Sequence, residues 1–262
     1  MYQQYFGFTE EPFATDVAPE KLFRSKSLIE VQQRFEHVCS HRGVMLFTGH
    51  PGCGKTTAIR CLIDTMNRKT HYPVYLPLST VSVFEFYRQL NDALGGEKRY
   101  YKSEVYESIQ AQIKSLAGTR GVLPVVVLDE AHMLRLQNFR ELQIILNFHM
   151  DSMMPMVLIL AGQPALHKRM QSHELESFNQ RILLKYSLEP LSEKEVAAFI
   201  KTSFSMCGVT EKILSDSAYS VIFQKAKGLP RVTGSLVIKS LMYCAQNDKR
   251  RIDGDDVLIA SK

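Results

Sequence analysis

Eight consecutive residues have the types and spacing that bind a phosphate group. They fit the pattern G-x-x-x-x-G-K-[ST], and they lie between a strand-like run and a helix-like stretch, which is the context that the pattern requires. The glycines allow the backbone to curl so that its N–H groups face an anion, and the start of a helix adds unpaired donors with a partial positive charge. The residues of this predicted phosphate-binding loop are Gly49, His50, Pro51, Gly52, Cys53, Gly54, Lys55 and Thr56.

The end of the loop predicts a nucleoside triphosphate that is bound together with a divalent cation. We expect Lys55 to bridge the β- and γ-phosphates and the hydroxyl group of Thr56 to bind Mg²⁺. Thr57, one residue further on, is the less favoured magnesium ligand. Cys53 lies close to the start of the expected helix, where a thiolate is favoured, so redox control of nucleotide binding is a further hypothesis.

Two acids later in the chain predict the second half of a hydrolytic site. An apolar run at 124–128 is followed directly by Asp129 and Glu130. In this class of site, an acid at the end of a strand holds the Mg²⁺ shell, and we assign that role to Asp129. Glu130 is then placed to orient and polarise the attacking water as a general base. The two motifs together predict a protein that binds and hydrolyses a nucleoside triphosphate.

Further sequence patterns bear on the identity of the nucleotide and on the class of protein. No segment matches the N-K-x-D signature that reads guanine, so we expect ATP as the nucleotide. The residues at 129–132 also match the D-E-A-H box of one helicase group. That group needs a second recombinase-like domain, and the chain after Ser192 is too short and too helical to supply one. His132 is either a residue near the γ-phosphate or an ordinary polar residue at a helix start.

The elements that must position these residues alternate between apolar runs and helical stretches through about the first 190 residues. This alternation is typical of a parallel sheet with helices on both faces. The runs VVVLD and MVLILAG are apolar at consecutive positions, as expected for central strands that are covered on both faces. We expect strands at 44–48, 73–77, 125–128, 156–161 and 183–188, with helices between them at 55–67, 83–94, 104–117 and 139–149.

The strand patterns cease near residue 190, and three helical stretches follow at 192–207, 215–227 and 231–246. The residues at 192–195 form a capping-box pattern, and Gly-Leu-Pro at 228–230 separates the second stretch from the third. The predicted fold is therefore α/β, with a P-loop core on a five-stranded parallel sheet and a small all-helical domain after it. The expected domains are the core at 1–190, with an N-terminal segment at 1–40, and the helical domain at 191–262.

Length and composition exclude several other classes of protein. The chain has 262 residues, of which 45% are apolar and 23% charged, and its formal net charge is +5. These values suit one large or two small globular domains. No stretch approaches the about 18 consecutive apolar residues of a membrane span, so we expect no membrane segment. The five cysteines are widely spaced and form no C-x-x-C pair, so the sequence suggests neither a disulfide framework nor a zinc site. We therefore expect a cytoplasmic location.

Motifs along nearly the whole chain resemble, in order and spacing, those of the ExeA-like branch of the AAA+ ATPases. They are the aromatic segments at 5–8 and 11–13, the loop at 49–56, LDEAH at 128–132, LAGQP at 160–164, NQRI at 179–182 and GLPR at 228–231. The resemblance implies an ATPase that acts as a homo-oligomer, either a ring or a helical filament, with ATP at the subunit interfaces. Phe6, Phe8 and Phe13 then either pack near the adenine or anchor the N-terminal segment.

The resemblance also implies roles for residues that no local pattern identifies. Gln163 matches the sensor 1 position, whose polar side chain contacts the γ-phosphate or the attacking water. Arg181 matches the arginine finger, a positive charge supplied to the ATP site of the neighbouring subunit, and Arg169 is its nearest rival. Arg231 matches sensor 2, through which a helical lid responds to the γ-phosphate.

Two kinds of protein within this branch suggest two different roles. The ExeA secretion protein couples such an ATPase to a membrane-spanning segment and a periplasmic peptidoglycan-binding domain, neither of which we expect here. Stand-alone ATPases of this size resemble the partners of DDE transposases and are similar in role to MuB, TnsC and IstB. The resemblance therefore implies duplex DNA and a transposase as partners of the ATP-bound oligomer. A secretion-type assembly ATPase that does not act on DNA is the alternative.

A glycine-led loop at 95–102 is the candidate DNA contact. It lies between two expected helices and carries three basic residues and two tyrosines, on a part of the AAA+ core that commonly lines the central pore. Contacts from Lys98, Arg99 and Lys102 to the DNA backbone would give binding that is independent of sequence and sensitive to salt. The alternative is an ordinary solvated loop. The basic run at 248–251 is a weaker candidate, because such runs usually face solvent.

Overall fold

The structure, a computed structural model, describes residues 2–14, 17–77, 82–150 and 152–261. Its chain forms two compact units. The first, which we call the α/β unit, contains Glu30–Gly49 and Lys55–Leu188. The second, which we call the helical unit, contains Met1–Ile29, His50–Gly54 and Glu189–Lys262. The domain boundary between residues 190 and 191 stays a prediction.

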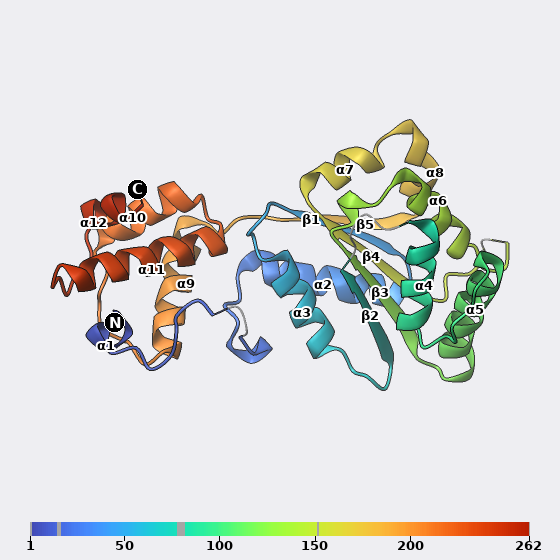
Figure 1. The fold of residues 1–262 in the computed structure, drawn as a ribbon, viewed down its shortest axis with the longest axis horizontal. Coiled ribbons are helices and arrows are strands. Elements are labelled where there is room, and N and C mark those ends of the chain that lie inside the picture. Colours follow the sequence, from blue (N-terminus) through green and yellow to red (C-terminus); the bar gives the residue numbers. More distant parts are fainter. Residues whose placement is uncertain (1, 15–16, 78–81, 151, 262) are drawn as a thin grey trace. The chain divides into compact units, whose positions relative to one another are not determined.

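The α/β unit is built on a sheet of five parallel strands in the order β2-β3-β4-β1-β5, which confirms the predicted fold class (Figure 1). The strands are β1 (Val44–Gly49), β2 (His71–Pro77), β3 (Leu123–Asp129), β4 (Val157–Gly162) and β5 (Ile182–Leu188). Each end lies within two residues of its predicted position. Because the strands are parallel, the last residues of β1, β3 and β4 lie at the same edge of the sheet.

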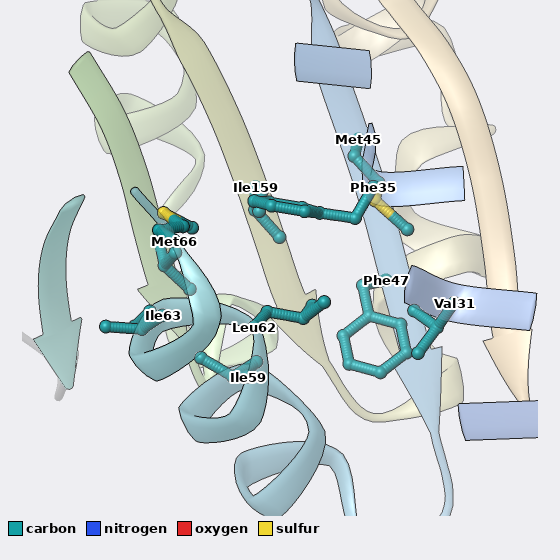
Figure 2. A pocket seen from close by; sticks show the side chains of 10 residues that line it. Val31, Phe35, Met45, Phe47, Ile59, Leu62, Ile63, Met66 and Ile159 are labelled. Carbon is teal, nitrogen blue, oxygen red and sulfur yellow. The ribbon is translucent and has the colours of Figure 1, made fainter. Parts of the chain in front are cut away.

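Side chains of the central strands alternate between two buried faces of this sheet. On one face, Leu46, Leu128 and Leu160 belong to the main apolar core. On the other face, Phe47 and Ile159 meet the helices α2 (Lys26–His41) and α3 (Lys55–Thr65), around an apolar cavity of about 10 Å³ (Figure 2). Such a lining offers water no hydrogen-bond partner, so the cavity is a packing gap and not a ligand site.

The remaining helices of the α/β unit cover the main core and its edges. They are α4 (Val83–Ala93), α5 (Lys102–Lys114), α6 (Leu136–Ile145), α7 (Pro164–Met170) and α8 (Glu176–Gln180), with short helical turns η2 (Ser115–Thr119), η3 (Ala131–Met133) and η4 (His173–Leu175). Four predicted helices correspond to α3, α4, α5 and α6. The largest error is in α6, which begins three and ends four residues before its predicted bounds. Helices α2, α7 and α8 were not predicted.

The helical unit contains α1 (Tyr2–Phe6), η1 (Pro19–Lys21), α9 (Glu193–Met206), α10 (Asp216–Ala226), α11 (Pro230–Gln246) and α12 (Gly254–Ala260). Three of these, α9 to α11, agree with the predicted helices, whereas α12 was not predicted. The predicted capping box is present, because Ser192 and Glu195 each bond to the other's backbone N–H. Throughout the described part of the chain, no helix has the length and apolar character needed to cross a membrane.

Aromatic side chains of the N-terminal segment pack inside the helical unit. The ring centroid of Phe8 lies 5.0 Å from that of Phe204, and the ring of Phe13 lies 5.4 Å from Phe199. A Cβ atom at Gly234 of α11 would lie only 3.0 Å from the Cβ of Phe13, so this close approach depends on the glycine. Of the two alternatives for these aromatic residues, the structure shows the anchoring role.

The basic run at 248–251 also takes part in this packing. Lys249 Nζ lies 2.5 Å from the Oδ1 atom of the buried Asp256. Burial raises the pKa of Asp256, but bonds from the Asp253 N–H and from Lys249 outweigh it and leave that pKa below its ordinary value. Arg250 donates to the backbone oxygen of Tyr5 and lies 4.3 Å above its ring. We therefore do not include this run among the DNA-contacting residues.

Candidate nucleotide-binding site

The phosphate-binding loop has backbone angles that only glycine adopts without strain. Gly52 and Gly54 have φ values of +78° and +99°, and the N–H of Cys53 donates to the backbone oxygen of His50 at 3.2 Å. Helix α3 begins directly after the loop, at Lys55, and a helix start presents backbone N–H donors and a partial positive charge that suit an anion. The chain here has the strand–loop–helix arrangement that phosphate binding requires.

Lys55 is a buried cation held against the loop backbone. The residue is only 6% exposed, and its Nζ donates to the backbone oxygen of Gly49 at 2.9 Å. Burying an ammonium group costs free energy unless the group is hydrogen-bonded and paired with an opposite charge. The contact with Gly49 keeps the ammonium group at the phosphate-binding loop, where an anionic ligand would pair with it.

Asp129, at the end of β3, is the hub of the polar contacts and is only 2% exposed. Its Oδ2 atom accepts from Thr56 Oγ1 at 3.2 Å and from the phenol of Tyr75 at 2.9 Å. Its Oδ1 atom accepts from the N–H of Glu130 at 2.8 Å. The hydroxyl group of Thr56 donates a hydrogen bond to Asp129, so the lone pairs of its oxygen can bind a cation. A hydroxyl and a carboxylate are hard oxygen ligands, which suit Mg²⁺.

Thr56 makes this contact with Asp129. The preference for Thr56 over Thr57 as the magnesium ligand stays a prediction. Tyr75 is a member of the site that no sequence motif identified. In the register of β2 and β3, Pro77 is paired with Asp129, so Tyr75, two residues earlier, lies on the same face of the sheet. Burial and the neighbouring Asp129 carboxylate raise the pKa of Tyr75, so the phenol stays protonated and donates.

Glu130 follows Asp129 in a strained conformation that turns the chain away from the strand. Its φ is +54°, in the left-handed region that few residues other than glycine adopt. Such strain is often found at functional sites, where the surrounding structure holds it in place. The Glu130 side chain is 42% exposed, and its Oε2 lies 3.2 Å from Nδ1 of His132. A carboxylate at this position is both accessible to water and held by a partner.

The neighbouring strand end brings Gln163 to the same place. Gln163 directly follows β4 as the N-cap of α7, and its backbone N lies 3.5 Å from His132 Nδ1. A Cβ atom on Gly162 would lie 3.2 Å from the same ring nitrogen, so the glycine allows His132 to approach β4 closely. The structure thus brings Glu130, His132 and Gln163 together at the adjacent ends of β3 and β4.

The two candidate arginine fingers have different surroundings. Arg181 is the C-cap of α8 and lies one residue before β5, with its side chain partly exposed. Arg169 is bound within its own unit, because its guanidinium donates to the backbone oxygens of His132, at 3.2 Å, and of Leu134. It also lies 5.1 Å from the ring centroid of Phe139. Arg169 therefore supports the turn that follows Glu130, and the arginine-finger role of Arg181 stays a prediction.

We expect Arg169→Ala to destabilise the fold by about 2 kcal/mol, because two backbone oxygens would be left without a charged hydrogen-bond donor. Urea denaturation of the purified variant measures this change. Lys168→Ala, which alters an exposed residue on the same helix, is the matched control and should unfold like the wild-type protein. A free energy of unfolding within about 0.5 kcal/mol of the wild-type value would contradict the supporting role of Arg169.

Within the helical unit, Arg231 lies close to a residue of the phosphate-binding loop. It is the second residue of α11, and its N–H donates to the backbone oxygen of Gly52 at 3.3 Å. A Cβ atom at Gly52 would meet the Cβ of Arg231 at 3.3 Å. The first turn of α11 therefore lies against Gly52, whose positive φ requires a glycine. The sensor role of the Arg231 side chain stays a prediction.

The candidate DNA-binding loop lies between α4 and α5 and presents two exposed tyrosines. Tyr100 and Tyr101 are 86% and 70% exposed. Lys98 and Arg99 are exposed as well, and Arg99 pairs with Glu97 at 2.9 Å. Lys102 differs from them, because it is the first residue of α5 and its Nζ lies 2.6 Å from Oε1 of the buried Glu141.

Comparisons with known proteins agree with this geometry. A family model described as "AAA domain" matches residues 36–170, which is just over half of the chain. The General secretion pathway protein A of Aeromonas hydrophila is 26% identical over 268 residues, covering 100% of this chain and 48% of the relative. The chain thus spans about half the length of this curated relative.

Solved structures resemble the chain at the level of the fold. Cdc6p from Pyrobaculum aerophilum matches with a TM-score of 0.69 and 16% identity, over 95% of this chain and 69% of that one. The Drosophila ORC bound to DNA matches with a TM-score of 0.69 and 15% identity, over 95% of this chain and 63% of that one. With a family model covering more than half of its residues, the chain belongs to the AAA domain family, whose members are ATPases.

Proposed function

We propose that the chain binds ATP together with Mg²⁺ and hydrolyses it at the edge of the sheet where β1, β3 and β4 end. The contact between Thr56 and Asp129, beside the strained Glu130, carries this proposal. Lys55 pairs with the phosphates, Thr56 binds the metal, and Asp129 holds the metal's shell. Mg²⁺ bound there would neutralise charge on the phosphoryl oxygens that lie next to it.

Glu130 acts on the attacking water in this proposal. Its exposed carboxylate orients the water and accepts its proton, while His132 holds the carboxylate in place at 3.2 Å. Gln163, at the next strand end, contacts the γ-phosphate or the water. Arg181 enters the ATP site of a neighbouring subunit and stabilises charge in the transition state, and Arg231 responds to the γ-phosphate.

Lys55→Ala tests the nucleotide-binding part of the proposal. Because the buried ammonium group pairs with the phosphates, we expect the variant to lose measurable binding of a fluorescent ATP analogue. Lys168→Ala serves as the control, since it removes an exposed lysine from the same unit. Circular dichroism shows whether both variants fold. Affinity for the analogue equal to that of the wild-type protein would contradict the site.

We further propose that the ATP-bound protein assembles into a ring or a helical filament that engages duplex DNA on behalf of a DDE transposase. An arginine finger that acts in a neighbouring subunit requires such an assembly. Two observations support the DNA part: the cationic and aromatic loop at 95–102, and the likeness in fold to an ORC that was solved bound to DNA.

The loop gives this proposal a direct test. Replacing Lys98, Arg99 and Lys102 together with alanine should weaken DNA binding and lower the salt slope by about one unit for each phosphate group that is no longer neutralised, while basal hydrolysis is kept. We expect Lys98 and Arg99 to carry most of the effect, because Lys102 already pairs with the buried Glu141, whereas the Glu97 partner of Arg99 is exposed to solvent. Fluorescence anisotropy across a salt series measures the slope. An unchanged slope in the triple variant would remove this loop from the DNA interface.

A secretion-type assembly ATPase is the second candidate function. The observation that favours it is the alignment of the whole chain with the General secretion pathway protein A of Aeromonas hydrophila. On this alternative, the oligomer acts on envelope proteins and does not bind DNA. The same DNA-binding measurement therefore separates the two roles.

A further inference from the structure

The phenol of Tyr75 reaches the most buried acid of the proposed ATP site. Its oxygen lies 2.9 Å from Asp129 Oδ2, although Tyr75 itself is on the edge strand β2 and is 39% exposed. We infer that Tyr75 is a positioning residue, which fixes the orientation of the Asp129 carboxylate toward the Mg²⁺ of the bound nucleotide. The inference rests on the proposed nucleotide site and adds to it a residue that belongs to neither sequence motif.

The hydrogen bonds of Asp129 show why this orientation matters. An ionised carboxylate offers about four acceptor positions. In the described part of the chain, Thr56 and Tyr75 donate to Oδ2 and the N–H of Glu130 donates to Oδ1. About one acceptor position is then left, on Oδ1, for the metal's shell. The carboxylate can act on the metal only if its plane is held so that this acceptor position faces the metal's shell.

Tyr75 is the donor that can hold the plane from the side of the sheet. The final torsion of an aspartate side chain is broad, so the orientation of its carboxylate plane depends on the hydrogen-bond donors around it. Thr56 must also serve the metal, and its hydroxyl contact at 3.2 Å is the longest of the three. The phenol makes a shorter contact from β2, whose register with β3 is continuous from His71 to Pro77.

Tyr75→Phe removes the phenol oxygen and keeps the ring. Tyr72→Phe is the matched control, because Tyr72 lies on the same strand but packs against the main apolar core. The experiment measures binding of fluorescent ADP to the full chain, first in EDTA and then over a series of Mg²⁺ concentrations. A thermal denaturation curve of each metal-free variant accompanies it, since a purely structural role of the phenol would appear there alone.

We expect Tyr75→Phe to bind ADP in EDTA like the wild-type protein but to need about tenfold more Mg²⁺ for the metal-dependent gain in affinity. Loss of a group that orients a metal ligand commonly costs 10–100-fold in metal affinity. Tyr72→Phe should follow the wild-type curve. A wild-type Mg²⁺ response in Tyr75→Phe, with or without a lower melting temperature, would overturn the inference. A wild-type protein that binds no nucleotide would instead overturn the proposed site, and the inference with it.

Discussion

Replacing Arg181 with alanine is expected to lower the rate of ATP hydrolysis by about 10³–10⁵, the range found for arginine fingers. Arg181 lies after α8 and before β5, and Arg169, its rival, is bound to the backbone oxygens of residues 132 and 134. A steady-state phosphate-release assay measures the change. Arg181→Lys, which keeps the charge but loses the planar fork of donors, should recover only part of the activity.

Mixing variants shows whether Arg181 acts on a neighbouring subunit. Lys55→Ala lacks a working phosphate site but keeps its arginine, whereas Arg181→Ala has an intact phosphate site. Where the two variants meet at an interface, the Arg181→Ala chain supplies an intact phosphate site and the Lys55→Ala chain supplies the arginine. A mixture of the two inactive proteins should therefore recover measurable hydrolysis. Absence of any recovery across mixing ratios, in conditions where the wild-type protein assembles, would contradict an arginine that acts between subunits.

Glu130→Gln is expected to lower turnover by about 10²–10⁴ while ATP binding is retained. Glutamine keeps the size and hydrogen-bonding reach of the side chain but cannot accept the proton of the attacking water. The contacts that bind nucleotide, from Lys55, Thr56 and Asp129, are unchanged by the substitution. Single-turnover hydrolysis and a binding titration with an ATP analogue separate the two effects.

Glu174→Gln, which alters an exposed acid on η4, is the control for this substitution. It should hydrolyse ATP at the wild-type rate. Turnover of Glu130→Gln at the wild-type rate would show that Glu130 is not the general base. Loss of ATP binding in that variant would place Glu130 among the binding residues instead.

The sheet could be predicted closely because its signal is local. The central strands are buried on both faces, which requires consecutive apolar residues, and the runs at 125–128 and 157–161 have them. The phosphate-binding loop is also contiguous, since one turn and one helix start make most of it. Helix α2 carried a readable pattern that was missed: Leu28, Val31, Phe35 and Val38 are buried at helical spacing.

Contacts between distant segments could not be predicted in the same way. Tyr75 meets Asp129 only because β2 and β3 pair in one register, and a tyrosine in a strand otherwise looks like an ordinary sheet residue. Lys102 looks like part of a basic loop, but it starts α5 and pairs with Glu141 of α6. The two members of each pair are far apart in sequence, and the residues around one member do not indicate which residue it contacts.

DNA binding by Glu130→Gln is the measurement that tests most directly whether ATP allows this protein to engage DNA. The variant is titrated onto labelled random-sequence duplex DNA with ATP, with ADP or without nucleotide, across a salt series. We predict tight binding that falls steeply with salt and appears only with ATP. If the variant binds ATP and assembles but does not bind DNA even at low salt, the DNA-directed role is contradicted and the secretion-type function is favoured.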